Sequence, residues 1–96
     1  MSYVPLLAFQ RLRVAGEHMT ALEVIQQKGW IQLAYDSPNG VCLSRALTIT
    51  YPTWSEYDHA YRKLRKLLGG VELVEWNDYP GRTKEEVLAV LQEAGV

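Results

Sequence analysis

The stretch Glu75–Val87, EWNDYPGRTKEEV, combines an aromatic residue, two short polar residues, a Pro-Gly pair and a Thr-x-x-Glu spacing. Pro80 and Gly81 suit the centre of a type II turn, because proline fixes the first φ angle and glycine tolerates the positive φ that follows. Thr83 and Glu86 have the spacing of a capping box, in which each side chain accepts a hydrogen bond from a backbone N–H. The stretch therefore predicts a sharp corner followed by a helix.

The polar residues of this corner allow two interpretations. Asn77 and Asp78 can bond to nearby backbone N–H groups in Asx-type turns, while Trp76 anchors the corner in the core. Alternatively, Asn77, Asp78 and Arg82 form a polar cluster beside a helix N-terminus, where backbone dipoles favour anions. Asp78 argues against an anion, because its carboxylate competes for the same donors. A structural corner of Trp76, Asn77, Asp78, Arg82 and Thr83 is the favoured interpretation.

Two more capping boxes lie upstream, at Thr20–Glu23 and Thr53–Glu56. The first predicts a helix from Ala21 to Lys28, which Gly29 ends. The second predicts a longer helix, in which apolar residues recur every three or four positions and are expected to face the core. These apolar positions are Trp54, Tyr57, Tyr61, Leu64 and Leu68.

The remaining segments give weaker signals. A helix is expected within residues 40–51, where apolar residues share one stripe and Pro52 stops it. Short strands are expected at Ile31–Tyr35 and Val71–Trp76, with strong turn chemistry in DSPNG between the first strand and the next helix. Residues 1–16 fit either a helix or a strand, and we favour a helix. All three tryptophans are expected to serve the core or its edge.

Length and composition favour one domain spanning residues 1–96. The chain has 48% hydrophobic and 22% charged residues, close to the averages for globular proteins. Its formal net charge of -1 provides no overall field to attract nucleic acid or an anionic membrane. We therefore expect a mostly α fold, a compact single-domain bundle of four or five short helices with at most one minor pair of short strands.

The single cysteine bears on both location and chemistry. One cysteine cannot form an internal disulfide, and no signal-peptide or membrane-spanning pattern is present, so a cytoplasmic setting is expected. Cys42 near a predicted helix N-terminus, followed by His59 and then Asn77 or Asp78, has the residue types of a thiol-dependent hydrolase. A buried, inert cysteine is the favoured interpretation. No metal-ligand spacing occurs, and no cofactor is expected.

A basic run, RKLRK, supplies Arg62, Lys63, Arg65 and Lys66 near the end of the long helix. This position complements the helix dipole, so an ordinary solvated face explains the run. A phosphate-contacting patch for weak nucleic-acid binding is the alternative. For an acidic protein partner, these four side chains are the expected contact surface, with Tyr3, Tyr35 or Tyr79 as apolar anchors.

Three stretches resemble a known family. They are GWIQ at 29–32, Cys42 with Ala46-Leu47 behind it, and WNDYPGRTKEEV at 76–87. Together they resemble a domain-of-unknown-function family of small actinobacterial and actinophage proteins with a Trp-Asn-Asp-x-Pro-Gly-Arg-Thr motif. The resemblance covers residues 20–94 and treats 1–19 as an N-terminal extension. Where that family has Gly, this chain has Arg45, which argues against a close backbone contact there.

The resemblance implies an actinobacterial or phage origin and brings no known activity. Small size and the lack of a motif with catalytic geometry favour a non-enzymatic protein-binding module. With the implied origin, we expect a phage or prophage protein that acts on a host protein. A thiol-dependent hydrolase using Cys42 and a weak nucleic-acid binder using the 62–66 run remain the alternatives.

Overall fold

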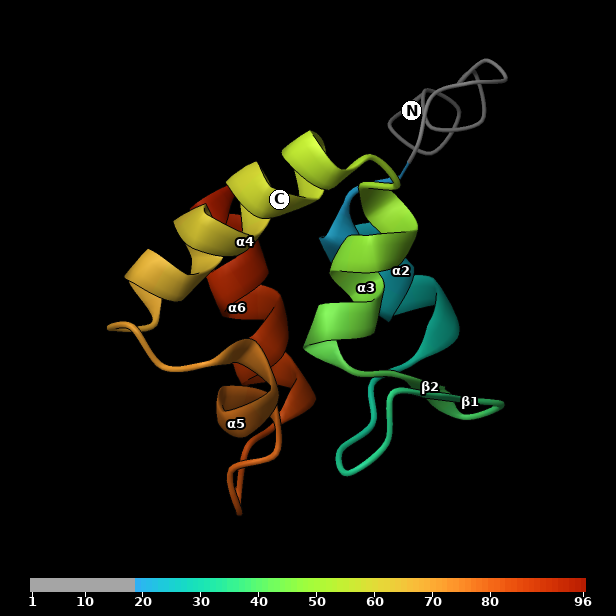
Figure 1. The fold of residues 1–96 in the computed structure, drawn as a ribbon. Helices are drawn as coiled ribbons and strands as arrows, with labels where there is room; N and C mark the ends of the chain where they lie inside the picture. Colours follow the sequence, from blue (N-terminus) through green and yellow to red (C-terminus); the bar gives the residue numbers. More distant parts are fainter. Residues whose placement is uncertain (1–18) are drawn as a thin grey trace, which may run out of the picture.

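A computed structural model describes residues 19–96, in which five helices surround one core (Figure 1). The helices are α2 (Ala21–Lys28), α3 (Leu43–Thr50), α4 (Trp54–Leu67), α5 (Leu73–Asn77) and α6 (Lys84–Ala94). Two-residue strands β1 (Asp36–Ser37) and β2 (Gly40–Val41) form one antiparallel hairpin. The mostly α fold with one small pair of strands is confirmed. The helix favoured within residues 1–16 lies outside the described residues.

The predicted helix starts are confirmed. Thr20 and Thr83 form complete capping boxes, so α2 and α6 begin where the sequence places them. Thr53 also caps α4, since its hydroxyl accepts from the Glu56 backbone N–H. The second hydrogen bond of a capping box, from the Thr53 backbone N–H to the Glu56 side chain, is not formed there. Instead, the Thr53 hydroxyl donates to Glu56 Oε1 at 2.8 Å.

The core lies between the helices. Helix α2 packs mainly against α3, while α6 contacts both α2 and α4 (Figure 1). Each helix contributes fully buried aliphatic side chains: Ile25, Leu43, Leu47, Leu64, Leu73, Val87 and Leu91. Burial of such a side chain contributes about 1.5–3 kcal/mol, so this shared core determines how the helices pack. Among residues 19–96, no helix is long and apolar enough to cross a lipid bilayer.

Both predicted strand positions are wrong. Residues 31–35 are irregular, and the strand pairing occurs instead around the DSPNG turn, where Ser37 pairs with Gly40. The predicted strand Val71–Trp76 overlaps α5, in which Leu73 and Asn77 are buried one helical turn apart. A short run that mixes apolar and polar residues fits both periodicities, so tertiary packing decided between them.

The apolar stripe of α4 is only partly as predicted. Leu64 is fully buried, but Trp54 at the start of the helix is 75% exposed. Trp54 therefore does not serve the core, in contrast to Trp30 and Trp76, which pack against it. Ala60, one turn before Leu64, lies where α4 meets the core, and Trp54 is more than a turn further out.

Candidate functional site

The corner after α5 has the predicted backbone. Arg82 N donates to Tyr79 O at 3.0 Å across Pro80 and Gly81, and Gly81 adopts a φ of +87°. This geometry matches a type II turn with glycine at the position that requires a positive φ. Thr83 then caps α6. The turn and the cap of the corner therefore lie where the sequence predicts them.

Asn77 does not form the predicted local turn. Its side chain is fully buried, and its Oδ1 accepts from Trp30 Nε1 at 2.6 Å and from Leu43 N at 3.0 Å. Its Nδ2 donates to Ile31 O at 3.1 Å and to Asp78 Oδ1 at 2.9 Å. Asn77 thus connects α5 to the segment after α2 and to the start of α3.

Asp78 and Gln32 extend this connection. Asp78 Oδ1 accepts from Leu33 N at 2.9 Å, so the predicted local turn is wrong here too. Gln32 Nε2 donates to the carbonyl oxygens of Asn77 and Tyr79, at 3.1 and 2.9 Å. The segment 30–33, which we call the held loop, is therefore fixed to the end of α5 by several hydrogen bonds.

Arg82 is engaged with its own corner. Its Nε donates to Trp76 O at 2.9 Å, and its guanidinium carbon lies 3.7 Å from the centre of the Trp76 ring. Nη1 also lies 3.7 Å from Glu86 Oε1. Since Arg82 stacks on an aromatic ring and Asn77 is buried, the geometry favours a structural corner over an anion-binding cluster.

Leu33 in the held loop combines two unusual features, a positive φ angle and a highly exposed hydrophobic side chain. Its φ is +64°, and it is the one residue other than glycine with a positive φ among residues 19–96. Such a conformation costs a side chain with a Cβ roughly 1–2 kcal/mol. Its side chain is nevertheless 82% exposed, so it gains little from burial. Strain of this kind is found at functional sites, and no sequence pattern predicted it at Leu33.

The exposed hydrophobic side chains gather around α5. Seven large hydrophobic side chains are exposed among residues 19–96, and six of them line three surface hollows that all include Val74. We call this surface the Val74 face; it comprises Leu33, Tyr35, Trp54, Val71, Val74 and Tyr79. The seventh exposed side chain, Leu67, lines none of these hollows. Of the three apolar anchors that the sequence suggested, Tyr35 and Tyr79 lie on this face, and Tyr3 lies outside the described residues. The sequence did not point to Leu33 or Val74.

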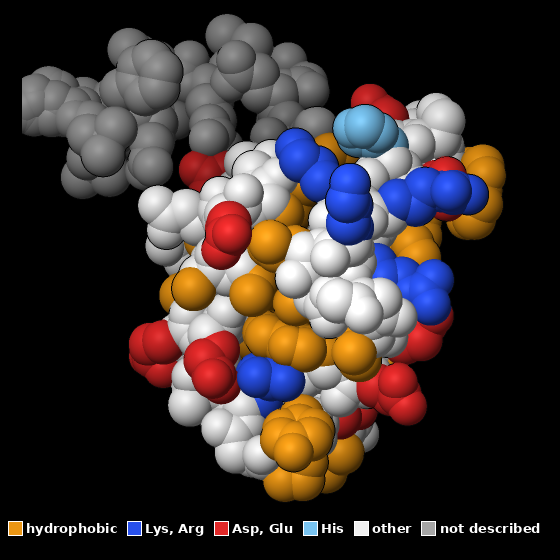
Figure 2. All heavy atoms as spheres, turned by 90° about the vertical axis from the view of Figure 1, so that its left-hand side faces the viewer, with side chains coloured by type: hydrophobic (Ala, Val, Ile, Leu, Met, Phe, Trp, Pro, Cys, Tyr) orange, Lys and Arg blue, Asp and Glu red, His pale blue; other side chains and the backbone are white. Residues whose placement is uncertain are grey.

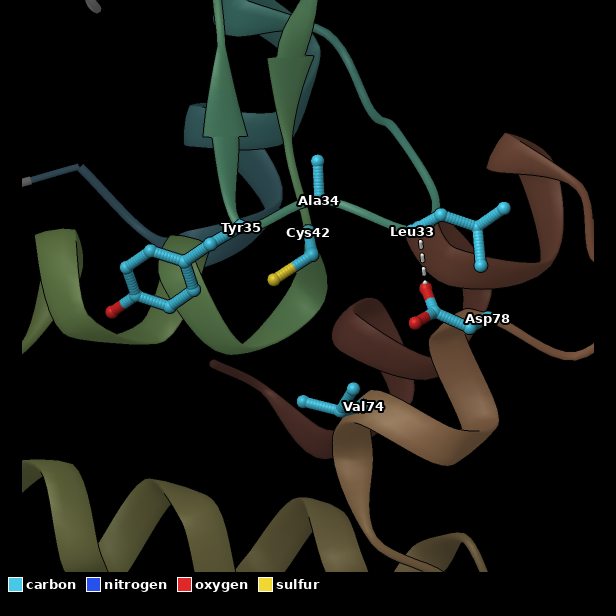
Figure 3. A pocket seen from close by; sticks show the side chains of 6 residues that line it. All are labelled: Leu33, Ala34, Tyr35, Cys42, Val74 and Asp78. Carbon is cyan, nitrogen blue, oxygen red and sulfur yellow. Dashed lines mark hydrogen bonds between the residues drawn. The ribbon is translucent and has the colours of Figure 1, made fainter.

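Cys42 lies at the floor of one hollow. It is the N-cap of α3, and only 4% of its surface is exposed. Figure 3 shows its thiol pointing into the space between Tyr35 and Val74. Asp78 lines the same hollow, but His59 does not. Among the described residues, no histidine that could act as the base for a nucleophilic thiol lines this hollow.

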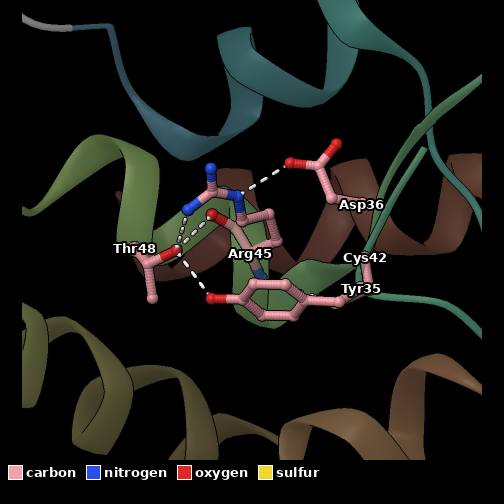
Figure 4. A network of polar contacts seen from close by, with 5 residues as sticks. All are labelled: Tyr35, Asp36, Cys42, Arg45 and Thr48. Carbon is pink, nitrogen blue, oxygen red and sulfur yellow. Dashed lines mark hydrogen bonds and ion pairs between the residues drawn. The ribbon is translucent and has the colours of Figure 1, made fainter. Parts of the chain in front are cut away.

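Arg45 holds Tyr35 in place (Figure 4). Its Nε donates to Asp36 Oδ2 at 2.9 Å, and this bond raises the pKa of the guanidinium above its ordinary value. Arg45 and the Tyr35 hydroxyl both bond to Thr48 Oγ1, and the guanidinium lies 5.5 Å from the centre of the Tyr35 ring. The network fixes an aromatic side chain at the edge of the Val74 face.

Two of the four basic side chains in the 62–66 run of α4 form ion pairs, and the other two do not pair with any residue in 19–96. Arg62 pairs with Asp58 at 2.9 Å, and Arg65 pairs with Glu72 at 3.2 Å. Lys63 and Lys66 are exposed and make no ion pair with any residue in 19–96. Figure 2 shows Lys and Arg side chains lying side by side on one face of the molecule.

The fold and the corner together define a small α-helical domain with a rigid loop and an exposed apolar surface. Within residues 19–96, no group of three or more His, Cys, Asp or Glu side chains is placed to hold a metal ion. Residues 12–95 match the model of a family of unknown function (DUF6197), and the chain belongs to that family. The match begins upstream of the 20–94 region that the motifs delimit. No curated protein and no solved structure shows significant similarity to the chain.

Proposed function

We propose that this protein is a small, non-enzymatic protein-binding module that uses the Val74 face. The observation that carries the proposal is that, of the seven large hydrophobic side chains exposed in the described part of the chain, six gather around Val74. Single exposed hydrophobic residues are common on monomers, whereas a contiguous apolar patch marks an interaction site. The face also carries Tyr and Trp side chains, the types that contribute most binding energy at interfaces.

The hydrogen bonds that fix Leu33 and Tyr35 on the Val74 face support the same function. The held loop presents Leu33 from a backbone fixed by Asp78 and Gln32. Tyr35 is fixed by its bond to Thr48 and by the Arg45 side chain. A surface that is already ordered loses less conformational entropy on binding, so more of the contact energy appears as affinity.

The basic side chains of α4, Arg62, Lys63, Arg65 and Lys66, are a second proposed contact, with an acidic surface of a partner. Lys63 and Lys66 carry charge that no ion pair within 19–96 neutralises, so they would set the association rate more than the affinity. Changing both to Glu should leave the thermal melt unchanged and slow association. An unaltered association rate would leave the run as an ordinary solvated face.

The resemblance of the closing motif to actinobacterial and actinophage proteins extends the proposal to a phage or prophage protein that binds a host protein. A cytoplasmic setting fits this role, as does the free thiol of Cys42.

A comparative capture experiment tests the proposed function. The wild type, a Val74→Ser/Tyr79→Ser variant and a Leu67→Ser control would each be immobilised and exposed to actinobacterial lysate. Leu67 is a matched control, because it is an exposed large hydrophobic residue outside the Val74 face. We expect a protein that is retained by the wild type and the control but lost from the double variant. Equal retention by all three, or by none, would contradict the proposal.

A further inference from the structure

We infer that the Val74 face receives a segment of a partner protein in which a Lys or Arg lies between two apolar side chains. The inference rests on the proposed function and adds the chemistry of the occupant. It depends on the shape of the face and on the charges that the face leaves without a partner.

The shape comes from two adjacent hollows. One, of about 370 Å³, lies between the held loop and α5, and the other, of about 590 Å³, lies beside α5 and the corner. Val74 and Asp78 line both hollows. An occupant that places one apolar side chain in each hollow must therefore cross Val74, and the residue between its two apolar side chains then lies next to Asp78.

The charges come from the residues that line the hollows of the face. Three of the charged residues there have opposite charges beside them: Asp58 pairs with Arg62, Glu72 with Arg65, and Arg82 with Glu86. Two do not, since neither Glu75 nor Asp78 makes an ion pair within residues 19–96. Asp78 uses Oδ1 for its two hydrogen bonds, and Oδ2 makes none with the described residues.

The face therefore offers two carboxylates that make no ion pair within residues 19–96, beside apolar hollows. An exposed ion pair contributes up to about 1 kcal/mol, so the two carboxylates add modestly to affinity. Their larger effect is on the choice of occupant, because an acidic peptide, an anionic lipid surface or a nucleic acid would be repelled. A cation between two apolar anchors complements both the hollows and the charge.

Selection from a displayed library of random linear peptides tests the inference, with the whole protein as bait. Enriched peptides would be synthesised, and their affinities measured against the wild type and a Glu75→Gln/Asp78→Asn variant. Asparagine at 78 keeps an oxygen that accepts from Leu33 N, so the held loop is preserved while both charges are removed. Glu85→Gln is the matched control, because Glu85 is an exposed carboxylate outside the hollows.

We expect enriched peptides with a Lys or Arg between two apolar residues. Their affinity should fall roughly tenfold for the double variant and remain unchanged for the control, since two exposed ion pairs together contribute about that much. Binding that requires Val74 but is indifferent to both charges would overturn the inference and leave the proposed function standing. The absence of any Val74-dependent peptide would overturn both. Self-association through the face, or binding to phosphatidylglycerol vesicles, would assign a different occupant and also overturn the inference.

Discussion

Asn77 Oδ1 lies 2.6 Å from the indole nitrogen of Trp30, 47 residues earlier in the chain. This bond joins the stretches GWIQ and WNDYPGRT of the sequence. The first supplies residues 30–32 of the held loop, and the second supplies the buried amide and the corner that fix the loop. Through these contacts, hydrogen bonds to the corner fix the backbone that presents Leu33.

Removal of the Asn77 side chain should be severely destabilising. Asn77→Ala leaves Trp30 Nε1 and Leu43 N without their common acceptor and Ile31 O without its donor. Each buried polar group left unsatisfied costs about 1–3 kcal/mol, so we expect a total loss of about 2–4 kcal/mol in denaturant unfolding. The exposed Asn39→Ala is the control and should change stability little. A loss below about 1 kcal/mol for Asn77→Ala would refute the structural role given to this side chain.

Gly40 should tolerate no side chain. A Cβ at Gly40 would lie 2.5 Å from the carbonyl carbon of Gly29, because the two glycine backbones are in close contact. Overpacking against backbone costs about 1–3 kcal/mol, and the positive φ of +150° adds strain. Gly81→Ala, at a φ of +87° with open space around it, isolates the strain alone and should cost about 1 kcal/mol. Similar unfolding free energies for the two alanine variants would contradict the close contact.

Alkaline pH should weaken the link between α4 and α5. The Tyr61 hydroxyl donates to Glu72 at 2.6 Å, and this bond, with burial, raises the pKa of Tyr61 above 10. The stabilisation is complete below the unfolded pKa of about 10 and is lost as pH rises through the higher folded value. Burial also raises the pKa of Tyr51, so the free energy of unfolding falls as Tyr51 loses its proton at high pH. The difference in unfolding free energy between wild type and Tyr61→Phe should therefore shrink above pH 10. A difference that grows above pH 10 would contradict a stabilising bond from the Tyr61 hydroxyl to Glu72.

The thiol of Cys42 should react slowly in the folded protein. It is 4% exposed and accepts a hydrogen bond from Arg45 N at 3.5 Å. A thiol reagent near neutral pH should label it rapidly only after denaturation. Rapid labelling of the native protein, slowed by Asp78→Asn or His59→Ala, would support the hydrolase alternative instead.

The sequence was most informative where structure is local. Capping boxes at Thr20 and Thr83 placed α2 and α6, because a cap is satisfied within one turn of its own helix. The hydrogen-bond partners of Asn77 could not be predicted, because Leu43 and Trp30 lie 34 and 47 residues away, beyond any local sequence pattern. The exposure of Leu33 and Val74 on the Val74 face was not predictable for a related reason. Burial depends on which elements meet, and the sequence pattern predicts a strand where the structure has α5.

Leu33 is held in a strained, exposed position, and we propose that its side chain binds a partner. Asparagine adopts positive φ more readily than leucine, so Leu33→Asn should raise the unfolding free energy by about 0.5–1 kcal/mol or leave it unchanged. The decisive measurement is the affinity of this variant for a protein captured, or a peptide selected, through the Val74 face. We predict a loss of at least about tenfold, as for an apolar anchor. Affinity equal to that of the wild type, in a variant that folds at least as stably, would show that the Leu33 side chain does not bind the partner.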